Sequence, residues 1–334
     1  MNTTRSISRP LIGITVLGFF GIALTVLTPP AVSTWILQRL SVFATIFLGI
    51  FIEAAPFLLL GTLSSGLVEV FLDRQWMLRL ASRQGFLAAF AGALMGFFFP
   101  VCECGVIPLT RRLYRKGLPL PTGVAFLLAA PVLNPIVIVS TAAAFGWGKM
   151  LLWRVIITLT IAVVVGMVFS VEKEPNNLLR AHSFNLHLHE HDTGNETGWL
   201  GKISQALVIS ADEFIEMGRY LVVGGMLAAA MQTFIPQSLL LAIGSGPFSS
   251  VLVMLALAFI LSICSTVDAF VALGFVGTFS FGSVLSFLTF GPMVDIKSLL
   301  MYRQVFKDRV VSYLILLPLL MSLLAGLVFN FFFP

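Results

Sequence analysis

Cysteine is the residue type in this sequence with the most distinctive chemistry, and two of the three cysteines stand two positions apart. Cys102 and Cys104 lie in the segment Pro100-Val101-Cys102-Glu103-Cys104-Gly105, and Cys264 lies in the second half of the chain. Thiolates favour soft metals, and trivalent arsenic and antimony share this preference because they are soft. Two thiols at this spacing in non-helical chain can therefore converge on one soft atom. The alternative is that the cysteines are small apolar packing residues.

The same segment is a predicted break in a helix. Pro100 removes a backbone hydrogen-bond donor, and Gly105 permits backbone angles that other residues avoid. Irregular backbone at membrane depth is tolerated inside protein or beside a water-filled cavity. We therefore expect the break to line a substrate site.

Polar side chains within apolar sequence form a second group of candidates, because charge inside a membrane is costly and is retained for function. Glu53 and Asp268 are the residues that we expect to carry protons. Asn134 lies between Pro131 and Pro135 in a second predicted break. The expected substrate-binding residues are Cys102, Glu103, Cys104, Gly105, Asn134, Cys264, Asp268 and Asp295.

A histidine-rich segment, His187-Leu188-His189-Glu190-His191-Asp192, lies in a hydrophilic stretch. Imidazoles and carboxylates this close together can bind a transition metal. His187, His189 and His191 are the candidate ligands for such a metal, and we expect no other cofactor. The alternative is a polar linker whose charge varies with pH.

The composition shows what must position these side chains. Hydrophobic residues make up 58% of the chain and charged residues 10%, whereas a soluble domain has roughly a quarter charged residues. Lipid must therefore be the solvent for most of the surface. The long apolar runs exclude an outer-membrane barrel, whose strands alternate. The net charge of +5 does not indicate a nucleic-acid partner in such a protein. The sequence predicts an all-α, multi-pass protein of the cell's inner membrane.

Stretches able to span a bilayer need about 20 apolar residues. An N-terminal span over 11–28 is favoured over a cleaved signal peptide because prolines occupy the expected cleavage region. Two further apolar stretches, 86–115 and 248–281, have polar centres. Gly291-Pro292-Met293-Val294-Asp295 is a predicted break within 283–302, as the repeat partner of the break at Asn134. The stretches predicted to span are 11–28, 41–71, 119–146, 150–170, 204–235, 283–302 and 310–333.

The distribution of Lys and Arg favours a re-entrant hairpin at 86–115, because basic clusters flank this stretch on both sides. A hairpin places both clusters in the cytoplasm, in agreement with the positive-inside rule. Arg111, Arg112 and Lys297 are then cytoplasmic, and Arg39, Lys149 and Arg154 are the basic residues expected outside. The N-terminus and the linker 171–202 are predicted to be cytoplasmic. The alternative is a pair of ordinary short spans.

The two halves of the chain repeat each other at a nearly constant offset. Phe51-Ile52-Glu53 matches Phe214-Ile215-Glu216, Cys102 matches Cys264, and Asn134 matches Asp295. An odd number of crossings in each repeat would invert one relative to the other, which is a common plan of secondary transporters. The predicted divisions are an N-terminal helix (1–40), a first repeat (41–170), a cytoplasmic linker (171–202) and a second repeat (203–334).

The motifs resemble those of the predicted-permease family that includes organoarsenical efflux permeases. The resemblance rests on three segments and covers roughly 40–334. It implies a permease that expels its substrate from the cytoplasm, and in the arsenical exporters that substrate is a trivalent methylated or aromatic arsenical. Cys102 and Cys104 are the positions carried over. The histidine-rich linker departs from the family pattern and leaves room for metal cations. The segments are Phe99-Pro100-Val101-Cys102-Glu103-Cys104-Gly105-Val106-Ile107-Pro108-Leu109, Ala130-Pro131-Val132-Leu133-Asn134-Pro135 and Cys264-Ser265-Thr266-Val267-Asp268-Ala269-Phe270.

The sequence thus predicts a transporter rather than an enzyme, with a soft metal or metalloid species as substrate. No Gly-x-x-x-x-Gly-Lys-Ser/Thr loop occurs in the chain, so coupling to a proton gradient is favoured over an internal ATPase. Two alternatives stay open. One is a permease for a small anion or a transition-metal cation, and the other is a thiol–disulfide protein that relays electrons across the membrane.

Overall fold

The computed structural model describes residues 30–72, 85–99, 101–171, 179–180, 199–234 and 246–332. The chain divides into two compact units, Met1–Ile46 and Phe47–Pro334, and the second unit contains most of both predicted repeats. The described residues are helical apart from turns and two isolated β-bridges. Five of the described helices are long and apolar enough to cross a membrane. The all-α membrane fold is therefore confirmed, while the predicted span 11–28 lies outside the described residues.

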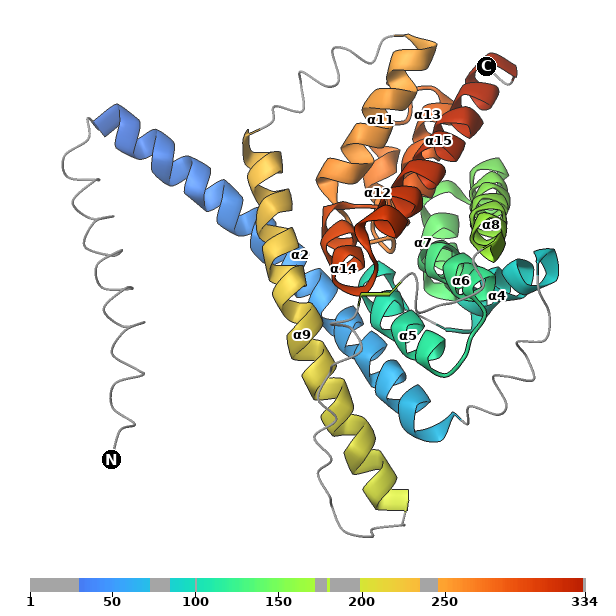
Figure 1. Cartoon of the computed structure of the whole chain (residues 1–334). Helices are drawn as coiled ribbons and strands as arrows, with labels where there is room; N and C mark the ends of the chain where they lie inside the picture. Colours follow the sequence, from blue (N-terminus) through green and yellow to red (C-terminus); the bar gives the residue numbers. More distant parts are fainter. Residues whose placement is uncertain are drawn as a thin grey trace. The chain divides into compact units, whose positions relative to one another are not determined.

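The helices occur in the same order in the two halves of the chain. Each half begins with a long helix and ends with another, and shorter helices separated by breaks lie between them (Figure 1). The inverted orientation of the two halves stays a prediction. The first half contains α2 (Pro30–Phe71), α4 (Phe86–Phe98), α5 (Glu103–Arg115), α6 (Leu120–Leu133), α7 (Pro135–Phe145) and α8 (Lys149–Val168), followed by the short 3-10 helix η1 (Phe169–Val171). The second half contains α9 (Trp199–Phe234), α11 (Pro247–Leu261), α12 (Asp268–Leu273), α13 (Phe281–Phe290), α14 (Ile296–Val305) and α15 (Asp308–Phe332).

Both stretches with polar centres are broken helices, as predicted. In the first, α4 ends at Phe98 and α5 begins at Glu103, and Cys102 between them has extended backbone. In the second, α11 ends at Leu261, and Ser262 adopts the left-handed region with φ 50°. A short helix, α12, begins at Asp268. The hypothesis that such a stretch is a re-entrant hairpin, which enters and leaves the membrane on the same side, stays a prediction.

A second pair of breaks follows, one in each half. Asn134 separates α6 from α7, and its side-chain oxygen accepts a hydrogen bond of 3.0 Å from the backbone N–H of Ile136. The predicted break within 283–302 is confirmed, because α13 ends at Phe290 and α14 begins at Ile296. Pro292 has no backbone N–H to continue a helix, and Asp295 caps the next one by accepting a 2.6 Å hydrogen bond from the backbone N–H of Ser298.

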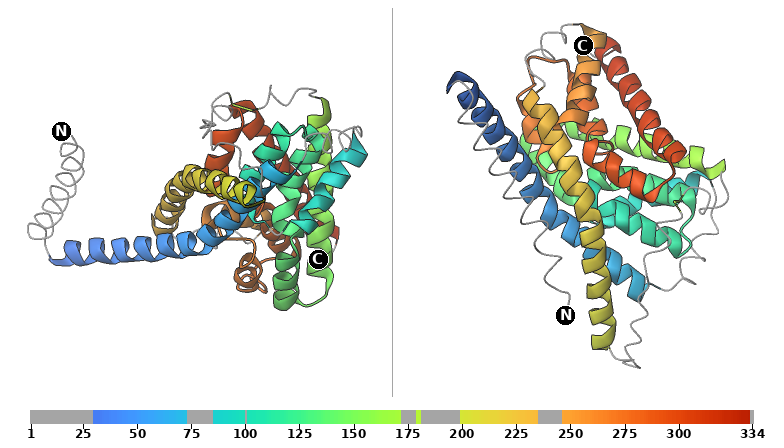
Figure 2. Two further views of the ribbon diagram at one scale, coloured as in Figure 1. Left: turned by 90° about the horizontal axis from the view of Figure 1, so that it is seen from below. Right: turned by 60° about the vertical axis from the view of Figure 1, so that its left-hand side comes forward.

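The short helices after the breaks pack against the opposite half of the chain. Helix α5 packs against α14, and α12 packs against α7, so each half supplies a short helix to the other. Within the halves, α4, α6 and α8 pack together, as do α11, α13 and α15. The views in Figure 2 show the green helices of the first half beside the orange and red helices of the second. The two breaks are therefore brought to the contact between the halves.

Glycine allows α4 to lie directly on α6. A Cβ atom on Gly96 would lie 2.7 Å from the Cα atom of Ala130, and one on Gly92 would collide with the backbone of Thr122. The Gly-x-x-x-Gly pattern of Gly92 and Gly96 predicts such close helix contact, and the structure confirms it.

We predict that Gly96→Ala destabilises the folded protein by about 1–3 kcal/mol, since the added methyl group must push two backbones apart. Thermal unfolding in detergent measures the effect. Gly218→Ala is the matched control, because a Cβ on this helical glycine meets no atom within 4 Å among the described residues. Equal melting temperatures for the two variants would contradict the close packing.

Candidate functional site

The three cysteines lie together although they come from opposite halves of the chain. The thiol of Cys102 is within hydrogen-bonding reach of the thiols of both Cys104 and Cys264. All three side chains are buried and none is in a disulfide. Cys102 is therefore the shared neighbour, and the first and second breaks meet at these sulfur atoms.

A group of buried charges adjoins the sulfurs. The Nζ atom of Lys297 lies 3.7 Å from an Oε atom of Glu103 and 3.4 Å from an Oδ atom of Asp295. Lys297 also donates a 2.6 Å hydrogen bond to the backbone oxygen of Ser262, and the Ser262 hydroxyl donates to Asp295 at 2.5 Å. These groups are at most 2% exposed. We call Cys102, Glu103, Cys104, Ser262, Cys264, Asp295 and Lys297 the central cluster.

Glu103 is the least satisfied member of the central cluster. Neither of its carboxylate oxygens accepts a hydrogen bond from another of the described residues. Its Lys297 contact, at 3.7 Å, is an ion pair without hydrogen-bond geometry. A buried acceptor without a donor costs about 1–3 kcal/mol. Glu103 therefore has unused capacity for a proton, a substrate group or water.

Glu53 on α2 faces the same region. Its carboxylate lies within electrostatic range of Lys297 and Glu103, and also of Asp268. One of its oxygens is buried and has no hydrogen-bond partner in the part of the chain that the structure describes. Glu53 is thus a partly buried carboxylate beside the central cluster.

Gly105 has a packing role in this arrangement. A Cβ atom on Gly105 would lie 2.9 Å from the Cα atom of Gly61 on α2, and one on Gly61 would collide with Gly105 in return. The two glycines let α2 and α5 touch backbone to backbone. Gly105 therefore brings α5, and with it Glu103, close to the helix that carries Glu53.

The second break carries its own ion pair. Arg154 on α8 donates to both carboxylate oxygens of Asp268, at 3.1 and 2.5 Å, and to the hydroxyl of Thr141 on α7 at 2.7 Å. Arg154 is 1% exposed, so it lies in the protein interior, although the charge count treated it as a basic residue on the outer side. A buried arginine is stabilised here by a fork of hydrogen bonds that matches a carboxylate.

The two breaks are built alike. Glu103 is the first residue of α5 and Asp268 is the first residue of α12. Each faces a buried cation from the other half, Lys297 for Glu103 and Arg154 for Asp268. The two contacts differ in strength, since the second is a bidentate hydrogen-bonded pair and the first is a longer ion pair.

Lys297 is the functional candidate that the sequence reasoning missed. We expected it on the cytoplasmic flank, but it is 1% exposed at the centre of the cluster. The error came from the count of charges by side, which placed Lys297 in the cytoplasm. The signal was present, because Lys297 follows Asp295 by two positions inside apolar sequence, where an ionisable residue indicates function.

Several other basic and acidic side chains are also buried. Arg111 and Arg112 were expected in a cytoplasmic cluster, yet both lie in the interior, where their partners include Glu213 on α9. Glu216 also pairs with Arg111, at 3.0 Å. The excess of Lys and Arg on the predicted cytoplasmic side persists when the buried cations Arg111, Arg112, Arg154 and Lys297 are left out of the count.

The remaining predicted residues are Asn134 and the three linker histidines. Asn134 is buried and caps α7, the helix against which α12 packs. His187, His189 and His191 lie outside the described residues. Among the residues that the structure does describe, no group of three or more His, Cys, Asp or Glu is arranged to hold a metal ion.

Comparison with known proteins gives the family. The model of a family described as "Predicted permease" matches residues 39–331. The chain belongs to this predicted permease family. UPF0718 protein YcgR of Bacillus subtilis is 46% identical over 284 residues, which cover 84% of this chain and 94% of the relative. A putative two-component membrane permease complex subunit of Streptococcus mutans is 36% identical over 269 residues, covering 79% of this chain and 87% of the relative. No solved structure matches the chain.

We predict that Asp268→Asn destabilises this permease by about 3–5 kcal/mol, since it leaves the Arg154 charge buried without its partner. The double variant Arg154→Met with Asp268→Leu should recover most of that loss, because it removes both charges. Melting in detergent compares the variants. Asp308→Asn, which breaks the exposed pairs with Arg180 and Arg303, is the control and should change little. A wild-type melting temperature for Asp268→Asn would show that the pair is not essential to the fold.

Proposed function

We propose that the protein is a secondary-transport permease that exports a soft metalloid species, with trivalent organoarsenicals as the favoured substrates. The observation that carries the proposal is the meeting of three buried thiols from two helix breaks. Transporter sites commonly lie where broken helices of two repeats meet. The family assignment supports permease activity, and the thiols support the choice of a soft substrate.

The thiol arrangement fits the chemistry of an arsenical with one organic group. Such a compound in its hydrated form carries two hydroxyl groups on As(III). Two thiols replace them, so that two As–S bonds form, two As–O bonds break and two water molecules leave, without a change in oxidation state. Cys102 has two thiol neighbours, Cys104 and Cys264, and we propose Cys102 with Cys104 as the main binding pair.

The charges around the thiols disfavour an anionic substrate. Glu103, Asp295 and the nearby Glu53 supply carboxylates, and Lys297 is the cation paired with them. An added anion would meet repulsion in a region of low dielectric, where unscreened charges interact strongly. A neutral arsenical or a cation is the better fit, so the small-anion alternative is the weaker one.

Export also needs an energy source, and we propose a proton gradient acting through Glu53. This carboxylate has an oxygen without a hydrogen-bond partner among the described residues and lies beside the central cluster. Asp268, the other proposed proton carrier, is held by two hydrogen bonds from Arg154. Glu53 is therefore the first choice for the coupling residue.

A second subunit and a defined orientation complete the proposal. The Streptococcus mutans relative is named as a subunit of a two-component complex, and we propose a partner subunit here as well. The charge distribution favours the inner membrane with the N-terminus and the linker 171–202 in the cytoplasm. Co-purification from native membranes tests the partner.

We predict that Cys102→Ser or Cys104→Ser abolishes protection of cells against methylarsenite, because a hydroxyl is a poor ligand for a soft atom. Cys264→Ser should weaken protection less if Cys102 and Cys104 form the main pair. Growth at increasing methylarsenite, at equal protein in the membrane, measures the effect.

The matched control for the cysteine variants is Ser265→Ala. Ser265 adjoins Cys264 and is fully buried, and its hydroxyl has no hydrogen-bond partner within the described segments. Its loss should leave protection unchanged. Full protection in both Cys102→Ser and Cys104→Ser would eliminate thiol binding as the mechanism.

For proton coupling, we predict that Glu53→Gln loses gradient-driven uptake of methylarsenite into everted vesicles but still exchanges bound for free substrate. The amide keeps the shape of the side chain and cannot carry the proton. Asp212→Asn, on the exposed face of α9, is the control. Uptake that still follows the pH gradient in Glu53→Gln would transfer the coupling role to another group.

The closeness of Cys102 and Cys264 also supports a second candidate, a thiol–disulfide relay. Such a relay requires a Cys102–Cys264 disulfide in living cells. Acid quenching, alkylation and mass spectrometry of the intact membranes would detect it. Fully reduced thiols under oxidising growth would leave the permease as the sole proposal.

A further inference from the structure

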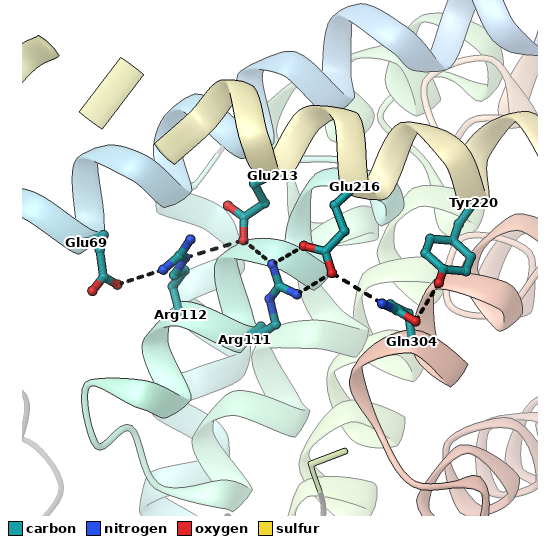
Figure 3. A network of polar contacts seen from close by, with 7 residues as sticks. All are labelled: Glu69, Arg111, Arg112, Glu213, Glu216, Tyr220 and Gln304. Carbon is teal, nitrogen blue, oxygen red and sulfur yellow. Dashed lines mark hydrogen bonds and ion pairs between the residues drawn. The ribbon is translucent and has the colours of Figure 1, made fainter. Parts of the chain in front are cut away.

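A second group of buried charges lies at the far end of α5 and plays no part in the proposed binding chemistry. Arg111 donates to Glu213 at 2.8 Å and to both oxygens of Glu216, at 3.1 and 3.0 Å. Arg112 pairs with Glu213 at 3.4 Å and with Glu69 at 3.6 Å. Figure 3 shows these side chains pointing toward one another from α2, α5 and α9.

The network continues onto α14. Gln304 donates a hydrogen bond to Glu216 at 3.3 Å and accepts one of 2.6 Å from the hydroxyl of Tyr220 (Figure 3). Lys116, just beyond α5, donates to the backbone oxygens of Glu69 and Leu72 at the end of α2. We call Glu69, Arg111, Arg112, Glu213, Glu216, Tyr220 and Gln304 the charge network.

Two helices connect the charge network to the central cluster. Helix α5 carries Glu103 at its first residue and Arg111 eight residues later, which is about 12 Å along a helix axis. Helix α14 carries Lys297 near its start and Gln304 near its end, and it packs against α5. A displacement of α5 that separates Glu103 from Lys297 must therefore also strain the contacts of Arg111.

We propose that the charge network is a gate, which closes the site on the side of the α5 C-terminus and opens when α5 separates from α9. This inference rests on the proposed function, because a gate requires a transported substrate. Arg111 is a positioning residue in this scheme, since it acts on the thiols through the position of α5. Its partners on α9 are carboxylates, so the contact can break and form again as discrete ion pairs.

The burial of these ion pairs supports a gate, because exposed ion pairs contribute little to holding two helices together. Arg111 and Glu213 have no exposed side-chain area, and Arg112 is 3% exposed. Breaking such a pair in place is costly, but the cost falls when the helices separate and water reaches the charges. The closed arrangement is therefore stable while water is excluded from the ion pairs. The open arrangement is stabilised because water hydrates the separated charges.

The test uses the native thiols as reporters and needs no substrate. A small, membrane-impermeant methanethiosulfonate reagent with a trimethylammonium group is added to everted or to right-side-out vesicles. Mass spectrometry then follows the rate of modification of Cys102, Cys104 and Cys264. For Glu216→Gln we expect modification about tenfold faster or more from the face of the α5 C-terminus, since losing the bidentate pair shifts the population toward the open state. The rate from the opposite face should stay at the wild-type value.

Three further variants with milder changes keep the test valid if Glu216→Gln does not fold. Tyr220→Phe removes a single hydroxyl that orients Gln304, and we expect a smaller increase from the same face, about twofold to threefold. Asp308→Asn, which removes the exposed ion pairs of Asp308, should leave the rate unchanged. Arg111→Lys retains the charge and should fall between wild type and Glu216→Gln.

Unchanged modification in Tyr220→Phe, and in Glu216→Gln where it is folded, would overturn the gate. Faster modification from both faces would also overturn it, because it indicates general loosening. The modification assay uses no arsenical. Its result can therefore contradict the gate while the proposal that the thiols bind substrate stands. Conversely, full methylarsenite protection in Cys102→Ser and Cys104→Ser, together with the expected face-specific rates in Glu216→Gln and Tyr220→Phe, would leave the gate standing while thiol binding fails.

Discussion

The structure depends on the cost of charge in a low-dielectric interior. Arg111, Arg154 and Lys297 are all buried, and each is compensated by at least one carboxylate from another helix. Removing one partner of a buried pair leaves an uncompensated charge, which costs far more than the pair itself contributes. These pairs therefore fix which helices must be neighbours. Glu103 with Lys297 joins α5 to α14, and Asp268 with Arg154 joins α12 to α8.

The helix breaks determine where those charges can lie. A continuous helix satisfies its own backbone, but its polar side chains must then face whatever surrounds its middle. Each break instead ends one helix and starts another in the interior, with an acidic first residue at Glu103 or Asp268. Acidic side chains at a helix N-terminus are favoured by the helix dipole. The breaks thus place carboxylates deep in the fold and leave the cysteines beside them.

Local chemistry explains why the sequence predicted some features and missed others. The break at Cys102 and the capped break at Asn134 were predictable, because proline and glycine act on the backbone near them. Asp295 and Asp268 were identified as deep carboxylates because they lie within apolar sequence, where an ionisable residue indicates function. The partners of these groups were not predictable, since Lys297 and Arg154 meet them through packing between distant helices. A count of charges by side assigned Lys297 to the cytoplasm and Arg154 to the outside, because it treats every cation near the end of a span as solvated.

The two charge groups of α5 are not independent. An arsenical on Cys102 would occupy space beside Glu103 and Lys297, and any shift of that ion pair moves the first turn of α5. Because α5 carries Arg111 on the same helix, the shift reaches the contacts with Glu213 and Glu216. Linkage requires the reverse effect to be equal, so an opened network must change the affinity of the thiols by the same factor that binding changes the opening. In the proposed mechanism, a site built on one helix with a charge at each end therefore couples occupancy to access without a separate sensor.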